Sequence, residues 1–489
     1  MRVLISDIYQ AYKKCHKGKA KSVKAQKYSA MLIDNIFDTH FALQTNTYKP
    51  KSYTSFVATN GSKPREIFAA SFDDRVVHHY LISRLEKIIS HKFIYHSCAN
   101  QINKGTHFGV NALQKMMRKG DTHYLQLDIF NFFYSIDKKI LLSILAKHLK
   151  IAIKKRQIHL QQGRDYYQLC SKILTKVRQK NHLSADELAK IPPHKQLKNV
   201  AKNKGLPIGN LTSQFFGNVY MHELDIFIKH QLKVKSYVRF ADDFVLLGNK
   251  TQLEIWQQQI QLFLQTELIL KLKSEQILKP VDSGIDFLGY IIYPHYKLVR
   301  KRVVHNFYKK LKQWEKENIK NGKIDLNKQS TLTIHSLVAS YIGHFKHANS
   351  AKLIQSKFSQ FKWLALLFNG YKNNYTIKTV NKFASKFSHQ LYYFHQAFKG
   401  FIVLVQKGKF FTFKQNNLNK LPKQLQQLTI DLQTNLARLH IHFLNIMLDF
   451  FQQTSTPYVF ISEQGYVHNH LKQRKLRLLF HPQLIRGDL

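Results

Sequence analysis

The chain has 489 residues, and its 76 Lys and Arg exceed its 29 Asp and Glu to give a formal net charge of +47. Such an excess repels itself unless a polyanion is near, so it favours a nucleic-acid partner and excludes the near-neutral surface of an ordinary soluble enzyme. Hydrophobic residues make up 44% of the sequence, which excludes a disordered basic tail. Three cysteines are too few for a disulfide framework or a zinc site. No apolar run is long enough to span a membrane, and the N-terminus does not resemble a signal peptide. We therefore expect a cytoplasmic protein with no membrane partner.

The first part of the chain is predicted to be a helical extension followed by a hairpin. Apolar residues between Met31 and Phe37 recur at helical spacing. A short β-type run from Tyr53 to Ala58 leads into Asn60-Gly61, a dipeptide that favours a tight turn. Helical periodicity then returns from Val76 to Ile89.

Two predicted strand regions end at acidic residues. Apolar and polar residues alternate from Thr122 to Asp128, which is typical of a half-buried strand. A second region, Tyr237 to Leu247, has Asp242 and Asp243 between two apolar runs, which predicts a hairpin with paired acids at its turn. The intervening residues 150–204 are basic and mostly helical. Ser184 and Glu187 are predicted to form a capping box there, Asp137 is predicted to cap the preceding helix, and another helix is expected from Ser213 to about Ile228.

The C-terminal half alternates between helices and strands. We expect a helix at Leu253–Leu268, a strand at Phe287–Ile292, basic helices through 300–368, a strand at Phe401–Val405, a helix at Leu436–Phe451 and a basic helix at Lys472–Arg477. Strands and helices mixed in this order indicate an α+β sheet domain followed by a separate module.

The acids Asp128, Asp242 and Asp243 all lie where a strand meets a turn, with apolar neighbours. Each of them alone fits a turn residue or a helix cap. Together, in a chain with few acids, they incur repulsion and desolvation unless a cation compensates. Magnesium suits such oxygen ligands, and two ions about 3.5 to 4 Å apart can activate a 3′-hydroxyl and stabilise a leaving pyrophosphate.

The residues around these acids resemble motifs of reverse transcriptases. Leu127–Phe133 resembles palm motif A, and Phe240–Asp243 resembles motif C, with Phe240 in place of the more usual Tyr. Four further segments resemble family motifs. Lys63–Ile67 with Asp74–His78 resembles the first fingers motif, and Ser97–Gly109 resembles the second. Leu206–Gln214 resembles motif B, and Gly284–Tyr290 resembles the primer grip. The motifs occur in the family's order, and a thumb-like helix at Ser336–His347 extends the resemblance to about two thirds of the chain.

The resemblance implies an α+β right-hand polymerase fold with fingers, palm and thumb. Its expected parts are an N-terminal helical extension at 1–59, fingers at 60–118, a palm at 119–299 with a basic helical insertion at about 150–204, a thumb at 300–368, and a C-terminal accessory α/β module at 369–489. The last of these weakly resembles the first domain of MutS-type mismatch-recognition proteins through Phe401–Phe411, although a packed β-hairpin explains that stretch equally well.

The resemblance also implies roles for individual residues. Asp128, Asp242 and Asp243 would be catalytic and bind two Mg²⁺ ions, or Mn²⁺ as a substitute, with the backbone of Ile129 adding a ligand. The implied nucleotide-binding residues are Lys63, Arg65, Arg75, Phe133, Ile208, Gly209 and Gln214. The implied primer grip is Phe287, Leu288, Gly289 and Tyr290.

Some of these roles have plain alternatives. Phe133 would exclude a ribose 2′-hydroxyl, or it would belong to the core. The basic side chains of the fingers would face the triphosphate or template, or solvent. Gly209 is expected to let the backbone approach the nucleotide or template closely.

Two departures from the family pattern carry hypotheses. Many relatives have Gln before the motif B glycine and Pro after the serine, whereas this chain has Ile208 and Gln214. This pattern resembles the enzymes of diversity-generating retroelements and of bacterial defence groups, and loss of the amide beside the nascent base pair suggests relaxed base selection. Relatives also often place a proton-donating Lys after the motif C helix. Glu275 and Gln276 stand closest to that position, with Lys271 and Lys273 earlier, so the general acid is left unassigned.

The function expected from this resemblance is RNA-directed DNA synthesis. The enzyme would use dNTPs to make cDNA on a structured noncoding RNA or another RNA template, with a second copy of the chain or an accessory protein as a further partner. Antiphage defence is the favoured role, and error-prone copying in a diversity-generating retroelement is the alternative. A nucleic-acid-binding protein with a degenerate polymerase fold is the competing class, against which the complete acid triad argues. The template and the primer are left open.

Overall fold

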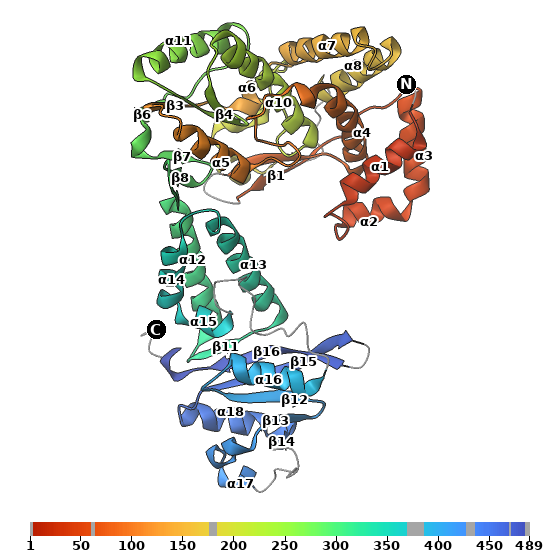
Figure 1. Ribbon diagram of the computed structural model, residues 1–489. Helices are drawn as coiled ribbons and strands as arrows, with labels where there is room; N and C mark the ends of the chain where they lie inside the picture. The colour runs from red at the N-terminus through yellow and green to blue at the C-terminus, as the bar shows by residue number, and fades with distance from the viewer. Residues whose placement is uncertain are drawn as a thin grey trace. The chain divides into compact units, whose positions relative to one another are not determined.

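A computed structural model describes residues 3–59, 64–175, 183–368, 386–426, 436–468 and 471–484. The chain divides into two compact units (Figure 1). The first comprises Met1–Leu288 with Ile292–His295, and the second comprises Gly289–Ile291 with Tyr296–Leu489. Within the described residues, every helix is too short or too polar to cross a bilayer.

The N-terminal part of the first unit is helical, as predicted. Helices α1 (Ile5–His16), α2 (Val23–Ala30) and α3 (Leu32–Gln44) come first, and α4 (Phe72–Ile89) follows the hairpin of β1 (Thr54–Ala58) and β2 (Arg65–Ala69). Apolar side chains of α1 and α4, among them Ile8 and Leu81, are fully buried in one core. The helices are therefore held by tertiary packing as well as by local propensity.

The centre of the first unit is a four-stranded antiparallel sheet with strand order β4-β5-β3-β6. Its strands are β3 (His123–Asp128), β4 (Ser236–Phe240), β5 (Asp243–Gly248) and β6 (Ile277–Pro280). Helices α5 (Thr106–Met117), α10 (Leu211–Ile226) and α11 (Lys250–Thr266) complete this part of the unit. The mixed helix and strand class is thus confirmed, and the predicted hairpin around Asp242 and Asp243 is present as β4 and β5.

A helical segment separates β3 from β4 along the chain. It contains α6 (Phe132–Ser135), α7 (Lys138–Lys154), α8 (Leu160–Thr175) and α9 (Ala185–Ala189). The Asp137 side chain accepts hydrogen bonds from the first backbone N–H groups of α7, and Ser184 with Glu187 forms a capping box on α9. Both predicted caps are confirmed, since their signals lie within a few residues of the helix ends.

The single strand expected over Phe287–Ile292 is wrong. The backbone turns at Leu288 (φ +53°) and Gly289 (φ +91°) and so separates β7 (Ile285–Phe287) from β8 (Tyr290–Ile292). Strand β9 (Lys297–Val299) follows. Uninterrupted apolar composition did not reveal the turn.

The second unit combines helices with a seven-stranded sheet. Its helices include α12 (Lys301–Asn318), α13 (Lys328–Phe345), α14 (Ala351–Gln360), α15 (Lys362–Leu367), α16 (Phe387–Ala397), α17 (Lys423–Gln426) and α18 (Leu444–Gln453). The sheet has the order β10-β11-β16-β15-β12-β13-β14. Its strands are β10 (Ile319–Lys320), β11 (Lys323–Asp325), β12 (Ile402–Lys407), β13 (Phe410–Lys414), β14 (Leu436–His440), β15 (Tyr458–His468) and β16 (Leu471–Phe480).

Two helix predictions in this unit need correction. The helix expected from Leu436 begins only at Leu444, because the preceding residues form β14 beside β13. Residues Lys472–Arg477 were expected to form a basic helix, but they belong to strand β16. There Arg474 and Leu476 are both buried, which is the two-residue period of a strand. The predicted β12–β13 hairpin is present with a turn at Gly408, while the likeness to MutS-type proteins stays a prediction.

Candidate active site

Three carboxylates lie at one end of the four-stranded sheet. Asp128 ends β3 and is paired in register with Asp243, the first residue of β5. Asp242 lies in the two-residue turn between β4 and β5, and its backbone carbonyl accepts a hydrogen bond from Ile129 N (3.3 Å). Ala241, the other turn residue, has the left-handed φ of +57° that few non-glycine residues adopt. Strand pairing and the turn therefore bring together acids that are 114 and 115 positions apart in the sequence.

These carboxylates carry more negative charge than their surroundings compensate. Burial raises the pKa of Asp242 to about 6 and that of Asp243 to about 7, and the charge of Asp128 adds to both shifts. The Gln126 amide donates one hydrogen bond to Asp243 Oδ1 (3.1 Å), which opposes the shift only in part. Asp128 Oδ2 forms an ion pair with Lys273, but its buried Oδ1 has no hydrogen-bond partner among the described residues.

The donor set suits a hard divalent cation, since it offers carboxylate oxygens and an uncompensated negative charge. No three His, Cys, Asp or Glu side chains in the described part of the chain are arranged so that they could hold a metal ion. The Asp128 carboxylate instead has the Lys273 ammonium as its partner. The carboxylate oxygens thus fit Mg²⁺ as ligands. In this structure the Lys273 ammonium neutralises the charge of one of them, Asp128.

A cavity of about 280 Å³ lies beside the acids. It is lined by five residues that the sequence singled out, namely Arg65, Ile129, Phe133, Ile208 and Asp242. Its other lining residues are Pro64, Asn131, Phe132, Tyr134, Lys195 and Lys273. One acid and three cationic side chains around an otherwise largely apolar space match a ligand that has both a charged and a flat apolar part.

The loop before α10 lies directly against strand β2. Ile208 O accepts a hydrogen bond from Phe68 N (2.8 Å), and the Asn210 amide donates to Phe68 O (2.9 Å). Gly209 has φ +107°, and a Cβ there would lie 2.7 Å from a methyl group of Ile67. This contact with the hairpin is one reason for a glycine here, while the expected close approach to a nucleotide or template stays a prediction.

The remaining predicted residues are placed in different ways. Phe133 lines the cavity and also packs against Phe132, with ring centroids 5.2 Å apart, so its exclusion of a 2′-hydroxyl stays a prediction. Gln214 is exposed on the first turn of α10. Arg75 lies on α4, where its charge acts on Cys15 and His79.

Five further predicted positions stay predictions. Lys63 lies outside the described residues. Of the primer-grip residues, Phe287 and Leu288 belong to the first unit, and Gly289 and Tyr290 belong to the second. The primer grip therefore stays a prediction.

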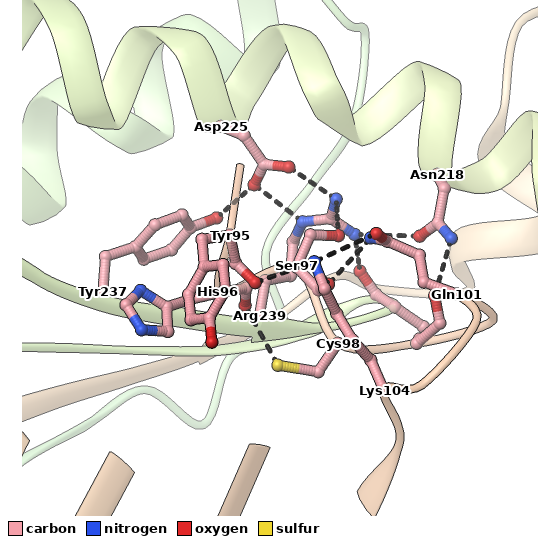
Figure 2. Close-up of polar contacts among 12 residues, drawn as sticks. Tyr95, His96, Ser97, Cys98, Gln101, Lys104, Asn218, Asp225, Tyr237 and Arg239 are labelled. Carbon is pink, nitrogen blue, oxygen red and sulfur yellow. Dashed lines mark hydrogen bonds and ion pairs between the residues drawn. The ribbon is translucent and has the colours of Figure 1, made fainter. Parts of the chain in front are cut away.

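Sequence reasoning missed two residues near the acids. The ion pair of Lys273 with Asp128 depends on a tertiary contact. Arg239 lies in a predicted strand, and in the structure it is fully buried and paired with Asp225 of α10 (Figure 2). An arginine inside an apolar strand, three residues before paired acids, was the available signal.

The fold and the site together define a nucleotidyltransferase: acids lie at one end of an antiparallel sheet, and one of them, Asp242, lines a cavity with three cationic side chains. Residues 49–292 match the family model described as reverse transcriptase (RNA-dependent DNA polymerase). The chain therefore carries a reverse transcriptase domain and is an RNA-directed DNA polymerase, as the motifs predicted. A comparison with curated proteins found no match.

Proposed function

We propose that this enzyme adds deoxynucleotides to a primer 3′-hydroxyl at the end of the sheet where Asp128, Asp242 and Asp243 lie. The observation that carries the proposal is the raised pKa of two of these carboxylates beside a cavity lined with cations. In this proposal residues 60–118 serve as fingers, 119–299 as palm and 300–368 as thumb.

Reverse transcriptases typically use Mg²⁺, and the three acids with the backbone of Ile129 would hold it here. Bound ions would activate the hydroxyl and neutralise charge on the departing pyrophosphate. Lys273 stabilises the carboxylate of Asp128 when no ion is present, and ion binding requires this pair to open. Because Lys273 also lines the cavity, we assign to it the proton that the leaving pyrophosphate takes up.

In this proposal each cavity residue contacts a different part of the nucleotide. Arg65 and Lys195 contact the triphosphate through charge-assisted hydrogen bonds. Phe133 faces the sugar, and Ile208 lies beside the nascent base pair. Lys63, Arg75, Gly209 and Gln214 complete the nucleotide-binding set that the family resemblance implies.

For the biological role we propose copying of a bound, structured noncoding RNA in antiphage defence. The net charge of +47 supports a tightly held RNA, because each phosphate contact contributes to affinity. Error-prone synthesis in a diversity-generating retroelement is the second candidate, favoured by Ile208 in the motif B loop. Sequencing the RNA and DNA that co-purify with the protein separates the two: a single dedicated RNA supports defence, and a template copied with scattered substitutions supports diversification.

The catalytic proposal is tested with Asp242→Asn in primer extension on an RNA template with Mg²⁺. DNA synthesis should be abolished while RNA binding, measured by filter retention, stays within about twofold, since one half-buried carboxylate contributes little to phosphate contacts. Asp282→Asn, at an exposed acid on the same unit, is the matched control and should retain extension. Unchanged DNA synthesis by Asp242→Asn would contradict the proposal.

A further inference from the structure

A fully buried ion pair lies directly behind the acid-bearing turn. Arg239 on β4 and Asp225 on α10 are both 0% exposed. Arg239 Nε donates to Asp225 Oδ1 (2.7 Å) and Nη2 donates to Asp225 Oδ2 (2.6 Å), which is the bidentate geometry of strong arginine–carboxylate pairs. Figure 2 shows the two side chains facing each other between the helix and the strand.

The rest of the guanidinium connects this pair to the turn and to a loop. Nη1 donates to the backbone carbonyl of Ala241 (2.8 Å) and to Asn218 Oδ1 (3.4 Å), and Nη2 donates to Ser97 Oγ (3.0 Å). With the two bonds to Asp225, five acceptors match the five N–H groups of an arginine. No other side chain offers this set of donors.

The contact with Ala241 bears on the acids because of where that carbonyl lies. It belongs to the peptide unit whose nitrogen is that of Asp242, so fixing the carbonyl fixes the direction in which Asp242 leaves the turn. Ala241 is held at φ +57°, a conformation that costs a non-glycine residue free energy unless its surroundings enforce it. The hydrogen bond from Arg239 is such an enforcement.

The loop at residues 95–104 gives Arg239 a rigid support. Arg239 N donates to His96 O (3.0 Å), and Cys98 N donates to Arg239 O (2.8 Å). Gln101 and Lys104 each donate a side-chain hydrogen bond to Ser97 O, at 2.7 and 3.4 Å. The arginine is therefore fixed on its backbone as well as at its guanidinium.

Stability alone does not account for this arrangement. Buried ion pairs are often replaced by neutral residues without loss of stability, because desolvation offsets most of their attraction. The arginine also holds the Ala241 carbonyl in place from a fixed position, which a neutral side chain that only fills the same space would not do.

We infer that Arg239 is a positioning residue that orients Asp242 and Asp243 for binding a divalent cation, acting through the carbonyl of Ala241. This inference rests on the proposed function of the acids. It predicts that the arginine acts on ion affinity and on turnover, and has little effect on nucleotide affinity.

The test uses the full chain with a neutral replacement of the pair, Asp225→Asn/Arg239→Gln. Binding of Mn²⁺ in the absence of RNA and dNTP is measured by electron paramagnetic resonance, together with the melting temperature, kcat and the KM for dNTP. The variant should melt near the wild-type temperature but bind Mn²⁺ roughly 10- to 100-fold more weakly, as is usual when a group that orients metal ligands is lost. We expect kcat to fall by a similar factor while the KM for dNTP changes less than about twofold.

Tyr237→Phe is the matched control. The Tyr237 hydroxyl donates to the same Asp225 oxygen (2.8 Å) and is equally buried, but its hydrogen bond goes to Asp225 and not to Ala241. Its Mn²⁺ affinity should therefore stay within about twofold of wild type. Arg239→Lys, which keeps a cation opposite Asp225 but has three donors, should lose Mn²⁺ affinity like the neutral pair.

Wild-type Mn²⁺ affinity in both folded Arg239 variants would overturn the inference, and so would an equal loss in Tyr237→Phe. If Asp242→Asn binds Mn²⁺ as tightly as wild type does, the acids are not the ion site and it is the proposed function that fails. The two failures are thereby distinguished.

Discussion

Each unit of this protein has an arginine–carboxylate pair beside a sheet. In the second unit the carboxylate of the pair itself has a lowered pKa, whereas in the first unit two acids next to the pair have raised pKa values. In the second unit Glu463 accepts from Arg474 (2.5 Å), Lys472 (2.9 Å) and the N–H of Gly408 (3.2 Å). Burial alone would raise the pKa of Glu463, but these donors outweigh it and the pKa is lowered. In the first unit, Asp242 and Asp243 next to the Arg239 pair have raised pKa values.

The direction of the pKa shift distinguishes a carboxylate that stabilises the fold from one that is retained for binding a ligand. A carboxylate whose donors are complete stabilises the fold in its charged form. A carboxylate that is buried with too few donors destabilises the metal-free protein, and it is retained where a ligand supplies the missing charge.

The largest expected effect contrasts Asp128→Asn with Glu463→Gln. Asp128→Asn should lower primer extension by roughly 10²- to 10³-fold or more, because the site loses charge where the reaction needs it. Glu463→Gln should leave specific activity within about twofold but lower the free energy of unfolding by about 1 to 3 kcal/mol, since Arg474 loses a charged acceptor. Extension assays and urea unfolding measure the two. Comparable loss of activity in both variants would end the distinction.

A smaller effect is expected from Phe133→Ala. Opening the cavity beside the sugar should raise the use of ribonucleotides relative to deoxynucleotides by about 10- to 100-fold, the range for one steric contact in a specificity pocket. Single-nucleotide kcat/KM values for matched pairs measure it. Phe130→Ala is the control, since Phe130 is 43% exposed and stacks on His194 instead. Unaltered sugar selection would leave Phe133 as a core residue only.

Ile208→Gln should change base selection by a few fold. A restored amide beside the nascent pair can hydrogen-bond the correct pair, and one such contact contributes about 1 kcal/mol. Sequencing of the cDNA should show fewer misincorporations, with Ile255→Gln, at an exposed position of α11, as the control. Identical error spectra for Ile208→Gln and wild type would contradict the hypothesis of relaxed selection.

The smallest effect concerns the stability of the metal-free protein. The pKa values of Asp242 and Asp243, about 6 and 7 when folded, exceed the value of about 4 for an unfolded carboxyl. The folded chain then binds more protons between about pH 4 and 7, so these groups contribute less stability as pH rises through this window.

Asp242→Asn removes one of these contributions. In the presence of a chelator its melting temperature should exceed that of wild type by a few degrees at pH 8, and the difference should shrink toward pH 4. Asp282→Asn should show no such pH dependence. A melting temperature below wild type at pH 8 would show that the site is not under electrostatic strain.

Sequence predicted those features whose signals are local. The cap at Asp137, the capping box at Ser184 and the hairpin that carries Asp242 and Asp243 each depend on residues close together in the chain, and all are present. The turn at Leu288 was missed because no composition signal marks a left-handed leucine.

What sequence could not supply was the partner of each charge. The Lys273–Asp128 pair joins residues 145 positions apart, and the Arg239–Asp225 pair depends on a helix lying behind a strand. Lys472–Arg477 was mistaken for a helix because its charges hide the alternation that buries Arg474. The sequence pattern around the acids predicts which of them lie together at one end of the sheet. The side chains that compensate their charge are known only from the folded chain.

The backbone contacts between β2 and the loop at Ile208 have a consequence for how this enzyme could diversify. Arg65 begins β2, and Ile208 hydrogen-bonds through its carbonyl to Phe68 on the same strand. If Arg65 and Ile208 have the roles proposed above, a change that shifts the hairpin would move both the group that contacts the triphosphate and the side chain beside the base pair. A mutation in the hairpin, far from Ile208 in the sequence, would then alter the rate of synthesis and the error rate together.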